Sequence, residues 1–320
     1  EMDSLVAGMQ FVMADVVGEC YTFKPKLRSD DEKKDTPHGT DHSDSSRCST
    51  PKSKSADSEE GSAPKGNKPK GDEWWWTRKV QRDVITDAVT YPYLLVTIGT
   101  GVSILRVDGP RKHERISGST IGGGTYWGLC RLLTDVEDFE DVLNLAERGD
   151  PSKVDMMVGD IYGENSDALE KLGLPSHIVA SSFGKLVAKQ DPASGIKQED
   201  LARALLLMVT INIGQVSYLN AQLHKTPRIY FVGNFLRHNS ISQQRLAFAI
   251  DYWSKGKMEA LFLEHEGNFG ALGAFLLSQG ISHSRQTKPT HHRSHTRSEF
   301  PTKPSSNDSS HPPRNRTKST

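Results

Sequence analysis

The sequence has little of several features that define common protein classes. Its three cysteines, Cys20, Cys48 and Cys130, are too few and too scattered for a disulfide framework or a zinc site. They suit a reducing setting, so we expect a cytoplasmic protein. No apolar run approaches the roughly 18 residues that span a bilayer, so we expect no membrane span. The 40 Lys and Arg residues balance the 40 Asp and Glu residues, so charge favours no nucleic-acid partner.

Apolar residues are also scarce, at 35% of the chain with a mean hydropathy of −0.55. Residues 24–73 hold almost no large apolar side chain and are dense in Ser, Lys, Asp, Pro and Gly. Such a segment cannot bury enough surface to offset the entropy of ordering, so we expect a disordered insertion on the surface. Residues 281–320, with eight basic and two acidic residues, are expected to form a disordered basic tail. Trp74–Trp76 could anchor a membrane interface or a partner, or fasten the insertion to the core.

The rest of the chain alternates between strand and helix patterns, which indicates an α/β fold. Apolar periodicity and capping residues predict helices, and short apolar runs predict strands. The expected helices are 1–17 (running into an extended piece), 125–133, 139–148, 150–161, 199–223, 240–255 and 269–277. The expected strands are 93–98, 102–107, 114–117, 228–232 and 260–263. The helix over 199–223 is apolar nearly all round, which predicts burial in a core or an interface.

Two glycine clusters are the strongest candidates for a ligand site. Gly99-Thr100-Gly101 separates two strands, and glycine allows a ligand to approach the backbone closely. Successive N–H groups in such a turn can bind an anion, and the hydroxyls of Thr100 and Ser103 lie at the same tip. The alternative is a plain hairpin that binds nothing.

The second cluster, Gly122-Gly123-Gly124, directly precedes a predicted helix, where free N–H groups and the helix dipole favour anions. Arg115 lies between the two clusters, and together they suggest a cleft for a phosphorylated ligand. A surface role for Arg115 stays open.

Two other stretches are weaker candidates. Gly233-Asn234 ends a predicted buried strand, where α/β sheets bind ligands, although a plain turn would look the same. Glu264-His265-Glu266 has metal-ligand residue types. Consecutive residues cannot all face one ion, so we assign no metal ligand.

Seven collinear stretches resemble the eukaryotic-type (type II) pantothenate kinases, of the actin/hexokinase/Hsp70-like superfamily. They cover residues 91–277 almost continuously, and residues 1–23 resemble the family's preceding segment. The stretches are TIGTGVSIL, ERISGSTIGGGTYWGLCRLLT, FEDVLNLAERGDPSKVDMMVGDIYG, VASSFGKL, EDLARALLLMVTINIG, FVGNFLR and AFAIDYWSKGKMEALFLEHEGNFGALGA.

The resemblance implies an actin-like (ribonuclease H-like) lobe at residues 74–280, preceded at 1–23 by the end of an upstream lobe and the first segment of the kinase domain. It also implies ATP-dependent phosphorylation of pantothenate, the first step of coenzyme A synthesis, with Mg²⁺ as the metal. Acyl-CoA inhibition and a homodimer or heterodimer are implied as well. The expected helix over 199–223 and the Ala180-Ser181-Ser182-Phe183 region resemble the segments that form the family's dimer contacts.

By the same resemblance, Thr100, Ser103, Arg115 and Trp253 contact pantothenate or acyl-CoA. The matching phosphate and nucleotide loops hold Gly99, Gly101, Gly122, Gly123, Gly124, Gly233 and Asn234. The family's glutamate base and first phosphate loop are expected upstream of Glu1, as in the C-terminal portion of a longer protein. A non-catalytic subunit that binds acyl-CoA and pairs with an active paralogue is the alternative.

Overall fold

A computed structural model describes residues 1–16, 18–25, 77–82, 91–164, 169 and 175–280. Most of the predicted insertion, the tryptophans Trp74–Trp76 and the predicted tail over 281–320 lie outside the described residues. Lys24, the first residue of the predicted insertion, is instead the last residue of strand β1 (Cys20–Lys24). This strand pairs antiparallel with β2 (Arg78–Arg82), which the sequence did not predict.

One seven-stranded sheet forms the centre of the fold, in the order β2-β1-β9-β8-β3-β4-β5. The remaining strands are β3 (Tyr93–Ile98), β4 (Val102–Gly109), β5 (Lys112–Ser119), β8 (Arg228–Val232) and β9 (Glu259–Leu263). The first three of these are antiparallel neighbours, whereas β8 and β9 run parallel to β3. Three antiparallel strands followed by two parallel ones is the order expected of a ribonuclease H-like lobe. The predicted α/β fold class is confirmed.

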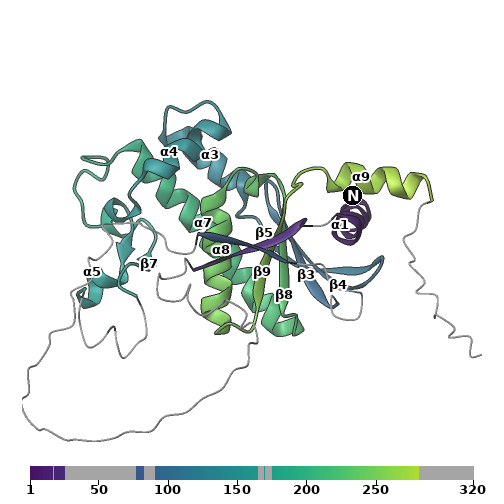
Figure 1. The fold of residues 1–320 in the computed structure, drawn as a ribbon. Coiled ribbons are helices and arrows are strands. Elements are labelled where there is room, and N and C mark those ends of the chain that lie inside the picture. The colour runs from purple at the N-terminus through teal and green to yellow at the C-terminus, as the bar shows by residue number, and fades with distance from the viewer. Residues whose placement is uncertain (17, 26–76, 83–90, 165–168, 170–174, 281–320) are drawn as a thin grey trace, which may run out of the picture. The chain divides into compact units, whose positions relative to one another are not determined.

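Residues of β3 show why the sheet is apolar on both faces. Leu94, Val96 and Ile98 belong to one buried cluster, and Tyr93 and Leu95 belong to another. Since successive side chains of a strand point to opposite faces, the four consecutive apolar residues Tyr93–Val96 need cover on both sides. Figure 1 shows this cover, with α1 and α9 on one side of the sheet and α7 and α8 on the other.

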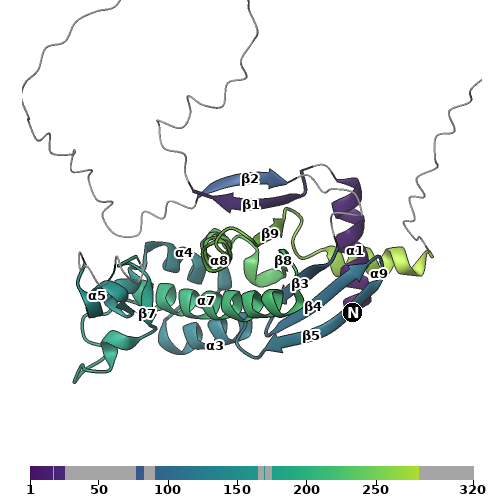
Figure 2. The same cartoon turned by 90° about the horizontal axis from the view of Figure 1, so that it is seen from below.

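The helices largely follow the sequence-based expectations. They are α1 (Met2–Asp15), α3 (Gly123–Leu133), α4 (Phe139–Arg148), α5 (Val158–Tyr162), α7 (Gln198–His224), α8 (Ser240–Ser254) and α9 (Phe269–Ser278). Figure 2 shows α7 running alongside α3 and α8. Helix α7 is apolar and long enough to cross a membrane, but more than half of its most apolar window is buried inside the fold. That burial is typical of the core helix of a globular domain.

The single helix predicted over 150–161 is wrong. Asp150 does cap a turn, since its Oδ1 accepts from the N–H of Ser152 at 3.0 Å, but the turn is a 3-10 helix over Pro151–Lys153. The chain then forms strand β6 (Met156–Met157), which pairs with β7 (Val179–Ser181), before α5 begins. Asp155, which lies between the 3-10 helix and β6, is buried, and its Oδ1 atom accepts from the N–H of Phe183 at 2.8 Å. These distant contacts override the local helix signal.

Helices α1 and α9 touch through their backbones. A Cβ atom added to Gly8 would clash with the carbonyl oxygen of Phe269, and one added to Gly273 would clash with that of Ser4. Both glycines therefore permit a helix crossing closer than side chains allow. The crossing ties the first helix of the chain to the last described one.

Candidate functional site

The hairpin tip between β3 and β4 is docked onto the N-terminus of α3. The N–H of Gly123 donates to the carbonyl of Gly99 at 2.8 Å, and the N–H of Gly124 donates to the carbonyl of Thr100 at 3.0 Å. These bonds join the two predicted glycine clusters into one unit. The tip lies at the carboxyl end of β3, beside the carboxyl end of the parallel strand β8.

The docking explains why the second cluster consists of glycines. A Cβ atom on Gly122 would lie 2.8 Å from the carbonyl oxygen of Thr100, and one on Gly123 would lie 2.7 Å from that of Gly99. The N–H groups of Gly123 and Gly124 are engaged by the hairpin, so they cannot also hold an anion. This corrects part of the expected anion site, because two of its N–H donors serve to hold the tip.

Ser103 and Arg115 are brought together on neighbouring strands. The Nε–H of Arg115 donates to the hydroxyl oxygen of Ser103 at 3.1 Å. The guanidinium lies against Gly118, where a Cβ atom would stand 2.6 Å from the Nη2 atom of Arg115 and 2.6 Å from the backbone oxygen of Val102. Because Gly118 pairs with Ser103 across the sheet, the arginine side chain extends toward the carboxyl end of β5, which adjoins the hairpin tip. Arg115 is exposed, as is Thr100 at the tip itself.

A buried carboxyl group lies at the same edge of the sheet, next to the turn that follows β8. Gly233 has a φ of +116°, which favours glycine, and its N–H donates to the Oε2 atom of Glu266 at 2.6 Å. The Oε1 atom of Glu266 is buried and has no hydrogen-bond partner in the part of the chain that the structure describes. Burial, the largest cause, and the nearby charge of Glu19 raise the pKa of Glu266 to about 8. The side-chain oxygen of Asn234 lies close to Gly267.

The three residues of the Glu264-His265-Glu266 stretch face three different partners. Glu264 pairs with Lys79, and the ring Nδ1 of His265 lies 2.6 Å from the buried carboxylate of Glu19. The hydrogen bond to Glu19 raises the pKa of His265. Within the described ranges, no group of three or more His, Cys, Asp or Glu side chains is placed to hold a metal ion.

Trp253 is not brought to the hairpin tip of its own chain. Its ring packs against that of Tyr218, with centroids 5.7 Å apart, and its carbonyl accepts from the Tyr218 hydroxyl at 2.9 Å. Trp253 lies at the end of α8, and α8 begins a few residues after Asn234. A helix of this length spans roughly 22 Å, so Trp253 and Asn234 lie at opposite ends of it.

Comparison with known proteins decides the family. A sequence model of the family named Fumble matches residues 1–277 of the chain. The chain belongs to the Fumble family.

The most similar relatives carry pantothenate kinase names. Pantothenate kinase 2 of Arabidopsis thaliana is 50% identical over 186 residues, which is 58% of this chain and 20% of that protein. Pantothenate kinase of Schizosaccharomyces pombe is 49% identical over 186 residues, which is 58% of this chain and 46% of that protein. This Fumble-family chain therefore matches about half or less of the length of these two relatives.

Solved structures are more distant. A xylulose kinase from Lactobacillus acidophilus is 14% identical, with a TM-score of 0.35 over 60% of this chain and 39% of its own. That likeness is too slight to support an inference about the site. The fold of the Fumble-family chain rests on its own strand order.

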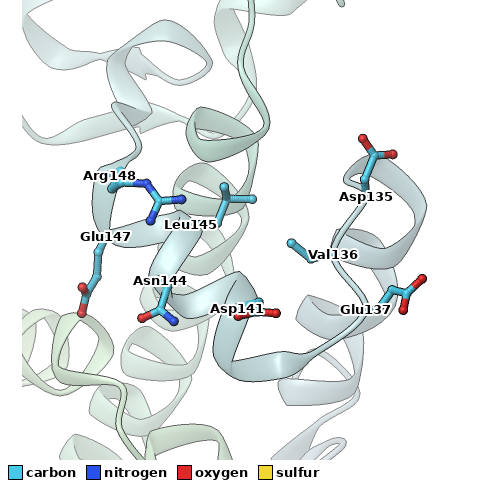
Figure 3. A pocket seen from close by; sticks show the side chains of 8 residues that line it. All are labelled: Asp135, Val136, Glu137, Asp141, Asn144, Leu145, Glu147 and Arg148. Atoms are coloured by element: carbon cyan, nitrogen blue, oxygen red, sulfur yellow. The ribbon is translucent and has the colours of Figure 1, made fainter.

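A cavity of about 800 Å³ lies elsewhere, beside α4. Figure 3 shows the side chains that line it, which come from α4 and from the loop before it. Four of them are carboxylates and only Arg148 is positively charged: the lining residues are Asp135, Val136, Glu137, Asp141, Asn144, Leu145, Glu147 and Arg148. An acidic hollow does not suit an anionic ligand, so we do not place the Fumble-family site there.

Three residues at the end of the sheet that holds the hairpin tip are not evident from the sequence. In sequence, Glu266 is one of three consecutive residues of metal-ligand type, and its burial next to Gly233 depends on the pairing of β8 with β9. Gly118 carries no signal apart from being a glycine near Arg115. Thr97 pairs with Ser103 across the sheet, and its hydroxyl oxygen is buried with no hydrogen-bond partner within the described ranges. In sequence it is one polar position in an apolar strand.

Proposed function

We propose that the protein carrying this chain is a pantothenate kinase. It would transfer the γ-phosphate of ATP to pantothenate, giving 4′-phosphopantothenate, the first step of coenzyme A biosynthesis. Membership of the Fumble family and about 50% identity to proteins named pantothenate kinase support this function. The observation that carries it is the Arg115–Ser103 hydrogen bond beside the docked hairpin tip.

The chemistry of this edge suits a negatively charged substrate. A guanidinium pairs with a carboxylate or a phosphate through two parallel N–H···O bonds. Arg115 has the two terminal nitrogens left for such a ligand, since its Nε is bonded to Ser103. Thr100 offers a hydroxyl at the exposed tip, and the turn at Gly233-Asn234 would face the nucleotide.

Mg²⁺ belongs to the proposal as the metal that accompanies ATP. Magnesium in such sites is held by one or two carboxylates together with the phosphates of the substrate. Among the described residues, no three or more His, Cys, Asp or Glu side chains are grouped so that they could hold a metal ion, so we assign no magnesium ligand in this chain. We derive no step through the metal.

Inhibition by acyl-CoA, a dimer and a cytoplasmic location complete the proposal. Leu219 and Leu223 are 54% and 75% exposed on α7, which suits a contact with a second copy or a paralogue. Trp253 lies at the opposite end of α8 from Asn234, where its ring packs against that of Tyr218. Its assigned contact would need a long acyl-CoA or a site shared between two chains.

Steady-state kinetics of the complete protein with ATP and pantothenate test the function. We expect ATP-dependent formation of phosphopantothenate, and Arg115→Ala should raise the KM for pantothenate roughly tenfold, as expected for the loss of a charge-assisted contact. Arg111→Ala, at the opposite end of the β4–β5 hairpin, is the matched control and should leave KM unchanged. Acyl-CoA binding without any turnover would instead support the non-catalytic subunit. A protein that neither binds acyl-CoA nor turns over pantothenate would refute both the kinase and the non-catalytic subunit.

A further inference from the structure

We propose that Glu266 is a positioning residue for the nucleotide, on which it acts as an uncharged carboxyl group through the backbone turn at Gly233-Asn234. The nucleotide itself comes from the proposed function, on which this role rests. The hydrogen bond between Glu266 and Gly233 joins the segment after β9 to the turn after β8. This contact lies at the end of the sheet that also holds the hairpin tip.

The turn that follows β8 has a closely constrained backbone. Gly233 adopts a φ of +116°, and a Cβ atom there would clash with the backbone of Ile98 in the neighbouring strand β3. The carbonyl of Gly233 accepts from the N–H of Leu236 at 2.9 Å, at the start of the 3-10 helix Asn234–Leu236. The turn lies at the carboxyl ends of the parallel strands β3 and β8, where α/β sheets bind ligands. A shift of this turn would therefore change the surface that a nucleotide meets.

Glu266 holds this turn from a different segment of the chain. Its Oε2 atom accepts from the N–H of Gly233 at 2.6 Å, which is short for a bond of this type. The next residue, Gly267, has a φ of +93°, and a Cβ atom there would stand 3.1 Å from the side-chain oxygen of Asn234. Glu266 and Gly267 therefore lie directly beside Gly233 and Asn234.

The other end of the turn is held by the helix that follows it. Asn239 donates to the carbonyl of Phe235 at 3.0 Å, and Gln243 of α8 donates to that of Leu236 at 3.1 Å. The ring of Phe235 would lie 3.3 Å from a Cβ atom on Gly123, so the turn also contacts the start of α3. Glu266 holds the end that adjoins β8, and with these bonds it fixes the whole turn beside the docked hairpin.

The surroundings of Glu266 favour an uncharged carboxyl group. Its Oε1 atom is buried and has no hydrogen-bond partner in the part of the chain that the structure describes. Burying an ionised carboxylate with one oxygen unpaired is costly, and the pKa of Glu266, raised to about 8, agrees with that cost. A negative charge behind the turn would also repel the phosphates of a nucleotide. The protonated side chain still accepts from Gly233 through Oε2.

Other ionisable groups around Glu266 stay in place when it is replaced by glutamine. They are Glu19 before β1, Tyr21 of β1, Lys79 of β2, and Glu264 and His265 of its own segment. Glu19 is hydrogen-bonded to the ring of His265, and Glu264 pairs with Lys79. Because Glu266→Gln keeps all of them, a difference between its pH profile and that of the wild type comes from Glu266.

Binding of ADP and of pantothenate to the complete protein, measured by calorimetry at pH 6.5, tests the proposal. Glu266→Leu offers no acceptor to the Gly233 N–H, so it should weaken ADP about tenfold and leave pantothenate within about twofold of the wild type. Glu266→Gln keeps an acceptor and should bind ADP within about twofold of the wild type. Glu264→Gln, in the surface pair with Lys79, is the control and should change neither ligand.

Three results at this pH would overturn the positioning role. They are unchanged ADP binding in Glu266→Leu, equal weakening of ADP and pantothenate in that variant, and a Glu266→Gln variant that binds ADP as weakly as Glu266→Leu. The second result would mean that Glu266 serves the general structure rather than the nucleotide.

The pH dependence of ADP binding tests the uncharged form. The carboxyl group of Glu266 keeps its proton below its raised pKa and loses it as the pH rises through about 8. Between pH 6.5 and pH 8.5 the wild type should therefore lose ADP affinity about threefold or more relative to Glu266→Gln. The comparison cancels the titration of ADP itself. Parallel profiles for the two proteins would refute a role for the uncharged group.

Hydrogen exchange of the Gly233 amide, measured on protein labelled with ¹⁵N-glycine, separates this role from the proposed function. The amide should be protected in the wild type and in Glu266→Gln, and exchange about tenfold faster or more in Glu266→Leu. This measurement needs no nucleotide. If ADP binds to none of the proteins, the proposed function fails while the exchange rates still decide whether Glu266 holds the turn. Equal exchange in all three proteins would refute it.

Discussion

The carboxyl group of Glu266 gives the sharpest quantitative prediction. It is buried at the edge of the sheet, accepts one hydrogen bond from the N–H of Gly233 and has an Oε1 atom with no partner in the described part of the chain. Replacing Glu266 by glutamine keeps a side-chain oxygen that can accept from the Gly233 N–H and keeps the size of the side chain, but the amide can no longer gain or lose the carboxyl proton. The substitution therefore isolates the cost of burying a negative charge there.

The size and sign of the effect follow from the raised pKa. Burial and the charge of Glu19 raise the pKa of Glu266 from 4.5 to about 8. Between these two pH values the folded protein retains a proton that the unfolded chain has released, so stability falls as pH rises. At about 1.4 kcal/mol per pH unit, the loss reaches at most about 5 kcal/mol at pH 8. The amide of Glu266→Gln does not titrate, so the variant does not lose this stability as the pH rises.

Urea unfolding from pH 5 to pH 8 measures the effect. Relative to the wild type, Glu266→Gln should gain stability steadily with pH, by several kcal/mol over the whole range. Glu264→Gln, two residues away in a surface ion pair with Lys79, is the matched control and should show a nearly constant difference. If the wild type and Glu266→Gln give parallel profiles, Glu266 is not a buried carboxyl group with a raised pKa.

Three further substitutions test the fold at the hairpin tip, before β6 and at the α1–α9 crossing. Gly123→Ala should lower the free energy of unfolding by about 2 kcal/mol, because its Cβ meets a carbonyl oxygen of the hairpin tip. Gly128→Ala, in open space on the same helix, is the control and should be neutral or stabilising when both variants are melted in a calorimeter. Burial raises the pKa of Asp155 to about 6, so the stability of Asp155→Asn relative to the wild type should increase by up to about 3 kcal/mol between pH 4 and pH 7. A pH-independent difference in urea unfolding would contradict this. Gly273→Ala should cost about 3 kcal/mol or more by separating α9 from α1, and Gly270→Ala, which meets nothing, should cost far less in the same assay.

Local signals were enough to predict most of the fold. The bounds of β3 and α4 were predicted as the structure has them, because an apolar run between turn residues and a capped amphipathic stretch each carry their own boundaries. The helix predicted over 150–161 failed because β6 pairs with β7, more than twenty residues later in the chain. Strand β2 is mostly polar and forms only because β1 offers it an edge.

The candidate site was predictable in part for the same reason. Thr100, Ser103 and Arg115 are close in sequence and share one hairpin, so their proximity followed from the strand pattern. The use of the Gly123 and Gly124 N–H groups could not be foreseen, because it depends on how the tip docks onto α3. The neighbours of Gly118 and Glu266 depend on cross-strand register, which a single sequence does not specify.

The structure of the complete protein bound to pantothenate tests the central claim most directly. We expect the ligand at the β3–β4 tip, with a carboxylate or hydroxyl oxygen within hydrogen-bond distance of a terminal nitrogen of Arg115 and with Ser103 still bonded to Nε. Pantothenate bound in the acidic cavity beside α4, or Arg115 turned away from a ligand at the tip, would contradict it.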